Sequence, residues 1–114
     1  MNIIESRTLT HARGLLQACG WIQGRSRTTD GYCLTGACKR ASGGGNTVKY
    51  RDATSALFTC LPDECRERWA PKPSDHPIRM RTRQVSALIE WNDTPYRTKE
   101  EVLDLFNRAL EATA

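Results

Sequence analysis

The C-terminal segment has apolar residues at helical spacing, and this feature constrains the fold of the chain more than any other. Thr98 and Glu101 have the spacing of a capping box, which satisfies free backbone N–H groups at the start of a helix. The apolar positions after them recur every three or four residues: Val102, Leu105, Phe106, Ala109 and Leu110. The segment therefore predicts a final helix that is capped by Thr98.

Three earlier segments show the same periodicity and predict three more helices. The first covers about residues 9 to 19 and is followed by Gly20, which stands where a left-handed C-cap falls. The second begins at Thr47. The third is predicted to begin near Thr82, because the prolines before it favour an extended path, and to break at Asn92. The chain is therefore expected to be mainly helical.

The segments between these helices predict the remaining organisation. Residues 21–34 are compatible with a short β-hairpin, but the arms are so short that an irregular connection is favoured. Thr35 can cap a brief helix, and residues 42–46 (Ser-Gly-Gly-Gly-Asn) predict a flexible loop. Residues 70–83 predict a proline-rich basic connection. We expect one domain over residues 1–114, a helical bundle of about four to five helices.

Composition agrees with one folded domain. The chain has 114 residues, of which 39% are apolar and 26% charged, which does not fit a wholly disordered protein. No apolar run reaches the length of a membrane span, and the first residues lack the pattern of a secretion signal. Five cysteines, an odd number, argue against a closed disulfide framework. We therefore expect a cytoplasmic protein with reduced thiols.

Basic residues concentrate in the middle of the chain. Residues 66–83 hold six basic residues against two acidic ones, although the net charge of the whole chain is only +4. Arg79, Arg81 and Arg83 alternate, and Trp69 lies close before them. An extended backbone would place the three arginines on one side, whereas a helix would spread them. These four residues are predicted to contact a partner protein, with nucleic acid as the alternative.

The sequence Trp91-Asn92-Asp93, followed by Arg97, has two interpretations. In the first, Asn92 and Asp93 satisfy backbone groups in a turn while Trp91 packs in the core. In the second, Asn92, Asp93 and Arg97 form a polar patch beside an aromatic floor, suited to a charged or nucleobase-like ligand. The structural interpretation is favoured, and the four residues are kept as a second candidate binding patch.

The cysteines allow two chemical hypotheses, neither of which is favoured. Two pairs, Cys33 with Cys38 and Cys60 with Cys65, have a spacing within the loose range for zinc. A catalytic thiol assisted by His76 and either Asp75 or Asp93 is the other. Burial of cysteine as a small apolar side chain is more common than either. We therefore predict no metal, no cofactor and no catalytic residue.

Three motifs carry a resemblance to a known family. They are GWIQG at residues 20–24, CLTGA at residues 33–37 and WNDTPYRTKEEV at residues 91–102. In these motifs the chain resembles an uncharacterised family of small proteins from actinobacteria, other bacteria and bacteriophages, with residues 42–84 poorly covered. The resemblance implies a phage or prophage setting and transfers no catalytic residue.

The leading hypothesis is therefore a small non-enzymatic accessory protein that binds and modulates a host macromolecule, with inhibition of a host defence system as one such role. A nucleic-acid-binding protein that uses residues 66–83 is one alternative. A binder of a small ligand or nucleotide, or an enzyme, at the corner of residues 91–93 is the other. The oligomeric state is left open.

Overall fold

Helices form most of the structure, a computed structural model that describes residues 3–112. The elements within that range are α1 (Ile3–Cys19), β1 (Arg27–Thr28), β2 (Gly31–Tyr32), α2 (Leu34–Ser42), α3 (Val48–Thr59), α4 (Asp63–Arg68), α5 (Pro77–Asn92) and α6 (Lys99–Glu111). The predicted small, mainly α domain is confirmed, although the described residues form six helices instead of about four to five. None of the helices in the described range is long and apolar enough to cross a membrane.

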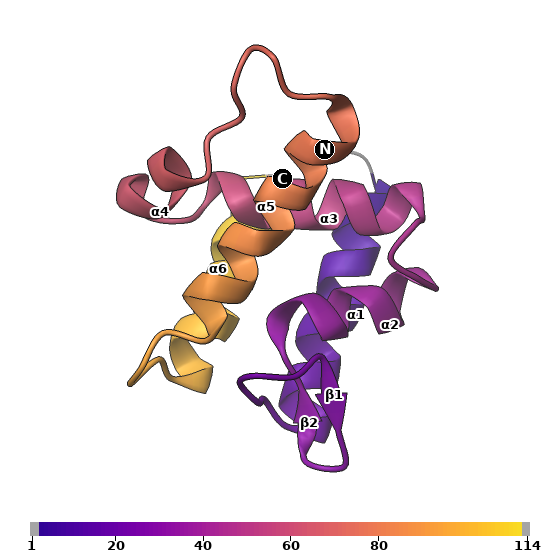
Figure 1. Ribbon diagram of the computed structural model, residues 1–114. Helices are drawn as coiled ribbons and strands as arrows, with labels where there is room; N and C mark the ends of the chain where they lie inside the picture. Colours follow the sequence, from indigo (N-terminus) through magenta and orange to yellow (C-terminus); the bar gives the residue numbers. More distant parts are fainter. Residues whose placement is uncertain (1–2, 113–114) are drawn as a thin grey trace.

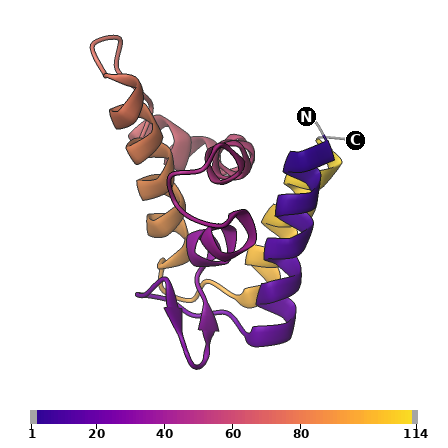
Figure 2. The same ribbon diagram turned by 90° about the vertical axis from the view of Figure 1, so that its right-hand side faces the viewer.

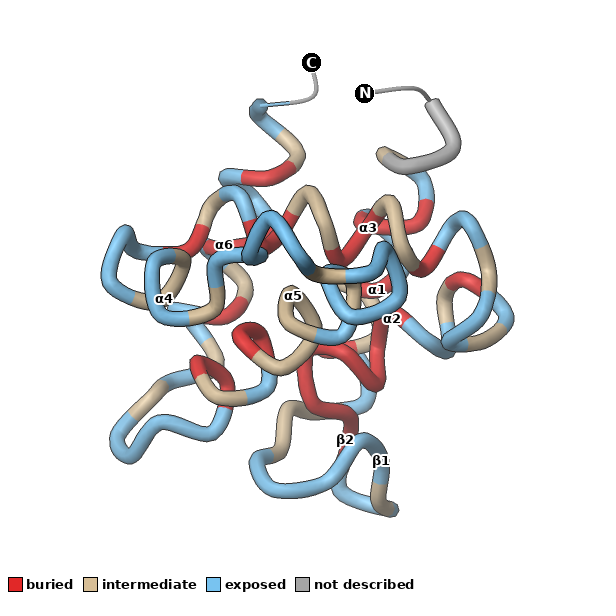
Figure 3. The backbone as a smooth tube through the Cα atoms, turned by 45° about the horizontal axis from the view of Figure 1, so that its top comes forward, coloured by how far each residue is buried: buried red, intermediate tan, exposed pale blue. Residues whose placement is uncertain are grey.

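The helices pack in three layers. Helices α1 and α6 lie side by side, α2 and α3 contact α1 in the middle, and α5 packs on the opposite side against α3 (Figures 1 and 2). The core between the layers is apolar and fully shielded at Leu16, Leu57, Leu88 and Phe106. Figure 3 shows the buried positions running through the centre of the fold and into strand β2, whereas β1 and most of the connections lie at the exposed outside.

Local signals set three helix ends as expected, although α1 begins at Ile3 instead of near residue 9 and α2 is capped by Cys33 instead of Thr35. Thr47 caps α3, because its Oγ1 accepts a hydrogen bond of 3.1 Å from the backbone N of Tyr50. The capping box of α6 is complete, with Thr98 and Glu101 each binding the other's backbone N–H. Gly20 has φ +98, and a Cβ there would lie 2.4 Å from the Asp30 carbonyl oxygen. These three predictions from sequence are confirmed.

The predicted start of the third helix is wrong. Helix α5 begins at Pro77, and His76 caps it by accepting a hydrogen bond of 3.2 Å at Nδ1 from the backbone N of Ile78. A proline in the first turn of a helix removes no hydrogen bond, because the N–H groups there have no partner within the helix. The basic connection therefore ends at residue 76 instead of 83, and the three arginines lie on a helix.

A hairpin forms between α1 and α2, although an irregular connection was favoured. Its strands pair antiparallel, with Arg27 opposite Tyr32 and Thr28 opposite Gly31. Trp21 pairs with Tyr32 from the other side, in a parallel bridge. The strands are only two residues long, so neighbouring elements must hold them, and β2 contacts both α1 and α2.

Candidate functional site

Asn92 is the centre of the corner between α5 and α6. Its side chain is fully buried. Its Oδ1 accepts hydrogen bonds from Trp21 Nε1 at 2.7 Å and from the backbone N of Leu34 at 3.1 Å. Its Nδ2 donates to the carbonyl of Ile22 at 3.2 Å and to Asp93 Oδ1 at 2.9 Å. One amide therefore joins α5 to both ends of the segment that contains the hairpin.

Two neighbouring residues strengthen the same junction. Asp93 Oδ1 also accepts a hydrogen bond of 2.9 Å from the backbone N of Gly24. Gln23 Nε2 donates to the carbonyls of Asn92 and Thr94, both at 2.9 Å. The first and third family-like motifs thus bind each other across the fold, and Leu34 of the second binds Asn92.

Arg97 and Trp91 complete the corner. The Arg97 guanidinium lies 4.1 Å from the centre of the Trp91 ring, and its Nε donates to the Trp91 carbonyl at 3.0 Å. The same guanidinium pairs with Glu101 at 2.9 Å. Trp91 is 4% exposed and Asn92 is fully buried, while the exposed Asp93 and the half-buried Arg97 hydrogen-bond to other groups of the same chain. The geometry favours the structural interpretation of the corner.

The four residues of the predicted contact stripe do not share one surface. Trp69 is partly buried against the core, and its Nε1 donates to Glu90 at 3.1 Å. Arg83 pairs with Asp75 at 2.8 Å and closes the connection onto α5. Arg79 is exposed, whereas Arg81 lies in the groove between α3 and α5. Because Arg79, Arg81 and Arg83 lie on a helix and not on an extended strand, they point in different directions.

Asp75 is almost completely enclosed, with 6% of its side chain exposed. Its Oδ2 accepts a hydrogen bond of 2.7 Å from the backbone N of Lys72 as well as the one from Arg83. These contacts, the Lys72 hydrogen bond above all, hold the pKa of Asp75 below its ordinary value. Asp75 and His76 are therefore engaged in ordering the entry to α5.

The cysteines are dispersed among structural roles. Cys33 caps α2, with its Sγ accepting from the backbone N of Gly36 at 3.3 Å. Cys38 is fully buried, and that burial raises the pKa of its thiol. Cys60 and Cys65 are half-buried, and Cys19 is exposed. Among the residues that the structure describes, no three His, Cys, Asp or Glu side chains cluster to hold a metal ion.

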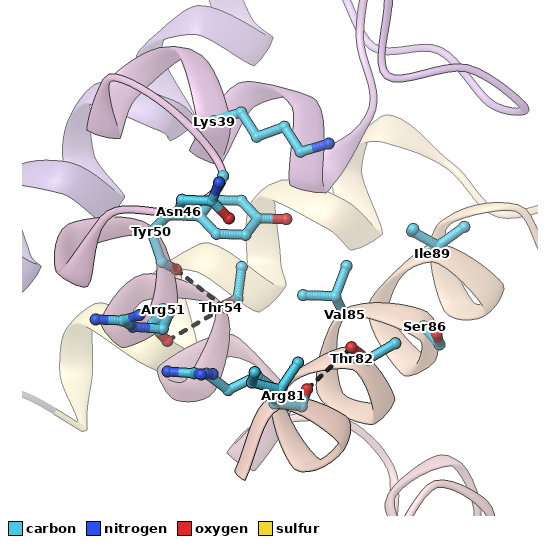
Figure 4. Close-up of a pocket in the computed structure, with 12 residues that line it drawn as sticks. Lys39, Asn46, Tyr50, Arg51, Thr54, Arg81, Thr82, Val85, Ser86 and Ile89 are labelled. Carbon is cyan, nitrogen blue, oxygen red and sulfur yellow. Dashed lines mark hydrogen bonds between the residues drawn. The ribbon is translucent and has the colours of Figure 1, made fainter. Parts of the chain in front are cut away.

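A groove between α3 and α5 is the site that the sequence did not reveal. Its volume is about 700 Å³. Helix α5 contributes Ile78, Arg81, Thr82, Val85, Ser86 and Ile89, and the other wall consists of Lys39, Gly45, Asn46, Tyr50, Arg51 and Thr54 (Figure 4). Two of the chain's exposed apolar side chains are here, because Ile78 is 60% and Ile89 42% exposed.

The groove has one sign of charge. Lys39, Arg51 and Arg81 line it, and none of its lining residues is acidic. No salt bridge within the described part of the chain uses any of these three cations. Their charge is therefore uncompensated and lies over an apolar floor. This combination is typical of a surface that recognises an anionic, partly apolar partner.

A model of DUF6197, described as a family of unknown function, matches residues 4–112. The chain belongs to DUF6197. This membership confirms the resemblance to an uncharacterised family and extends it over residues 42–84, which the motifs left poorly covered. Comparison with curated proteins and with solved structures gave no match. DUF6197 membership assigns no role to any residue, so the site rests on the geometry of this chain.

Proposed function

We propose that this protein is a non-enzymatic binding protein that modulates a partner protein by holding one of its acidic, amphipathic helices in the α3–α5 groove. One observation carries the proposal. The unpaired cations Lys39, Arg51 and Arg81 surround apolar side chains that the fold leaves uncovered. Burying those apolar side chains supplies affinity, and the cations select acidic segments.

The shape of the groove supports a helix as its occupant. The lining positions on α5 follow helical spacing, so one face of that helix lacks a partner along the groove. From Ile78 to Ile89 this face extends about 16 Å at 1.5 Å per residue. That length matches about three turns of a second helix, the usual geometry when an amphipathic helix binds in a groove.

Protein is favoured over nucleic acid by the floor of the groove. Ile78, Val85 and Ile89 gain nothing from a phosphate backbone, whereas apolar side chains of a protein helix would cover them. Three cations could contribute a salt dependence with a slope of about −2.7 on duplex DNA. This is weak compared with DNA-binding proteins that contact six to ten phosphates.

The cellular setting belongs to the same proposal. The family-like motifs suggested a phage or prophage protein, for which the partner is a host protein in the cytoplasm. Inhibition of a host defence system would then follow from occupation of a helix that the host complex needs. The groove supports binding as the mode of action, since occupation alone can block a partner.

The test uses a fluorescein-labelled peptide of 14 residues, with Leu at helical spacing and Glu on the flanks of the stripe. Its affinity is measured by fluorescence anisotropy for the wild type and for the double reversal Arg51→Glu/Arg81→Glu. We expect the double reversal to weaken binding by about tenfold or more, because attraction becomes repulsion at two positions.

The matched control is Arg7→Glu/Arg25→Glu, which makes the same change of net charge at two exposed arginines outside the groove. It should bind the peptide as the wild type does. Equal losses in both double variants would contradict the proposal, because they would show attraction to net charge alone. A duplex DNA probe that binds more tightly than the peptide would favour nucleic acid. Concentration-dependent dimerisation that the groove reversal abolishes would make a second copy the occupant.

A further inference from the structure

Tyr50 has a polar group that the fold leaves without a partner. The residue lines the groove and is 4% exposed. Its hydroxyl is the one buried side-chain polar atom of the described residues that makes no hydrogen bond. A buried hydroxyl without a partner is costly, so most such groups in proteins are satisfied. The unsatisfied hydroxyl is therefore a feature that calls for a function.

The hydroxyl is directed toward the groove. Figure 4 shows Tyr50 extending from α3 toward the α5 side, with the Lys39 ammonium from α2 on the same side of the opening. Thr54 is also there, but its hydroxyl is already used, donating to the carbonyls of Tyr50 at 2.9 Å and Arg51 at 3.1 Å. The Lys39 side chain is exposed and forms no ion pair within the described part of the chain, so its ammonium is free to turn toward a ligand in the groove.

The phenol acts as a donor at neutral pH. Burial raises the pKa of Tyr50, and the nearby thiols of Cys38 and Cys33 raise it further. The group is therefore an O–H that needs an acceptor, and Lys39, which lines the same groove, is a cation that needs an anion. A carboxylate satisfies both, because it has two acceptor oxygens and a negative charge.

We propose that the Tyr50 hydroxyl and the Lys39 ammonium together bind the carboxylate of one Glu or Asp side chain on the helix that the groove holds. This inference rests on the function proposed above and specifies the anchor of the partner. Apolar residues of that helix cover the α5 face, and one acidic side chain reaches across to α3. The partner is thus an acidic amphipathic helix with one carboxylate at a fixed position relative to its apolar stripe.

The experiment is a double-mutant cycle with the labelled Leu/Glu peptide. Each Glu of the peptide is changed to Gln in turn, and every peptide is measured against the wild type and Tyr50→Phe. We expect Tyr50→Phe to weaken the parent peptide by about tenfold, or about 1.4 kcal/mol. One Glu→Gln peptide should lose much of its sensitivity to Tyr50→Phe, which identifies the anchoring carboxylate. Lys39→Met should couple to the same position.

Two controls separate recognition from structure. Tyr96→Phe removes the same hydroxyl from a side chain that is 97% exposed, and should leave affinity unchanged. The melting temperature of Tyr50→Phe should stay the same or rise, since an unsatisfied buried hydroxyl is removed. Wild-type affinity in Tyr50→Phe would overturn the anchor while leaving the groove intact. A lowered melting temperature with unchanged affinity would show that the hydroxyl is structural.

If the α3–α5 groove does not bind an acidic helix at all, the binding measurements give a different pattern of results. If the Arg51→Glu/Arg81→Glu variant binds the peptide as the wild type does, the groove is not the binding site and the anchor is refuted with it. If that variant loses binding while every Glu→Gln peptide responds equally to Tyr50→Phe, only the anchor is refuted.

Discussion

Replacing Asn92 by alanine tests whether the family-like motifs form a structural junction. The substitution removes four side-chain hydrogen bonds from a fully buried position. Three groups lose their partner: Trp21 Nε1, the backbone N of Leu34 and the carbonyl of Ile22. Asp93 keeps its bond to the backbone N of Gly24.

The expected magnitude follows from the groups left unsatisfied. A buried donor or acceptor without a partner costs about 1 to 3 kcal/mol, and partial access of water to Trp21 keeps its cost near the lower end. We expect Asn92→Ala to lower the free energy of unfolding by about 3 to 5 kcal/mol. At about 4 °C per kcal/mol for a domain of this size, the melting temperature falls by about 12 to 20 °C.

The assay is urea unfolding followed by tryptophan fluorescence, supported by calorimetry. Asn107→Ala is the matched control, because Asn107 is exposed on α6 and accepts one hydrogen bond, from Arg13 at 2.7 Å. It should change stability by no more than about 0.5 kcal/mol. A loss below about 1 kcal/mol for Asn92→Ala would refute the junction. If peptide binding disappeared at the same time, the corner would be a binding site instead.

Two further predictions concern close packing and pH. In Gly36→Ala the new Cβ would lie 1.9 Å from the Ser26 carbonyl oxygen, so we expect a loss of about 2 to 4 kcal/mol in unfolding free energy. Gly14→Ala, which meets no atom within 4 Å, should gain about 0.5 to 1 kcal/mol in the same urea titration. Asp75 has a lowered pKa, so its stabilising contribution is complete above about pH 5 and is lost as the pH falls through the folded-state pKa. Between about pH 5 and pH 2 the melting temperature of Asp75→Asn should therefore fall less than that of the wild type, and an equal fall would contradict the assignment of Lys72 and Arg83 as the partners of Asp75.

Local chemistry explains which parts of the fold could be predicted. Thr47, Thr98 and Gly20 act on backbone groups within a few residues of themselves, so the sequence alone places the helix ends they define. The start of α5 was missed because proline stops a helix from inside but is favoured in its first turn. From the sequence, Pro77 could either precede the helix or stand in its first turn. The hydrogen bond from the backbone N of Ile78 to His76 shows that it stands in the first turn.

The structural role of the corner at residues 91–93 was predicted from the sequence, but its hydrogen-bond partners were not. Turn chemistry indicated that Asn92 and Asp93 satisfy backbone groups, and they do. Their partners at Ile22, Gly24 and Leu34 are about 60 to 70 residues away in the chain. No local pattern specifies such partners, because they depend on how α5 packs against the segment between α1 and α2.

The groove shows most clearly which features the sequence predicts and which only the tertiary structure reveals. The apolar and basic residues of α5 are visible in the sequence, and a helix that starts at Pro77 places Ile78, Arg81, Val85 and Ile89 on one face. Periodicity identifies such a face but does not say which element covers it. Only the tertiary structure shows that α3 packs beside this face without covering it and leaves the Tyr50 hydroxyl without a partner. The sequence by itself determined the mainly helical fold and the helix ends at Gly20, Thr47 and Thr98, because those depend on neighbours along the chain. The packing of the helices decided the junction and the groove, because those depend on neighbours in space.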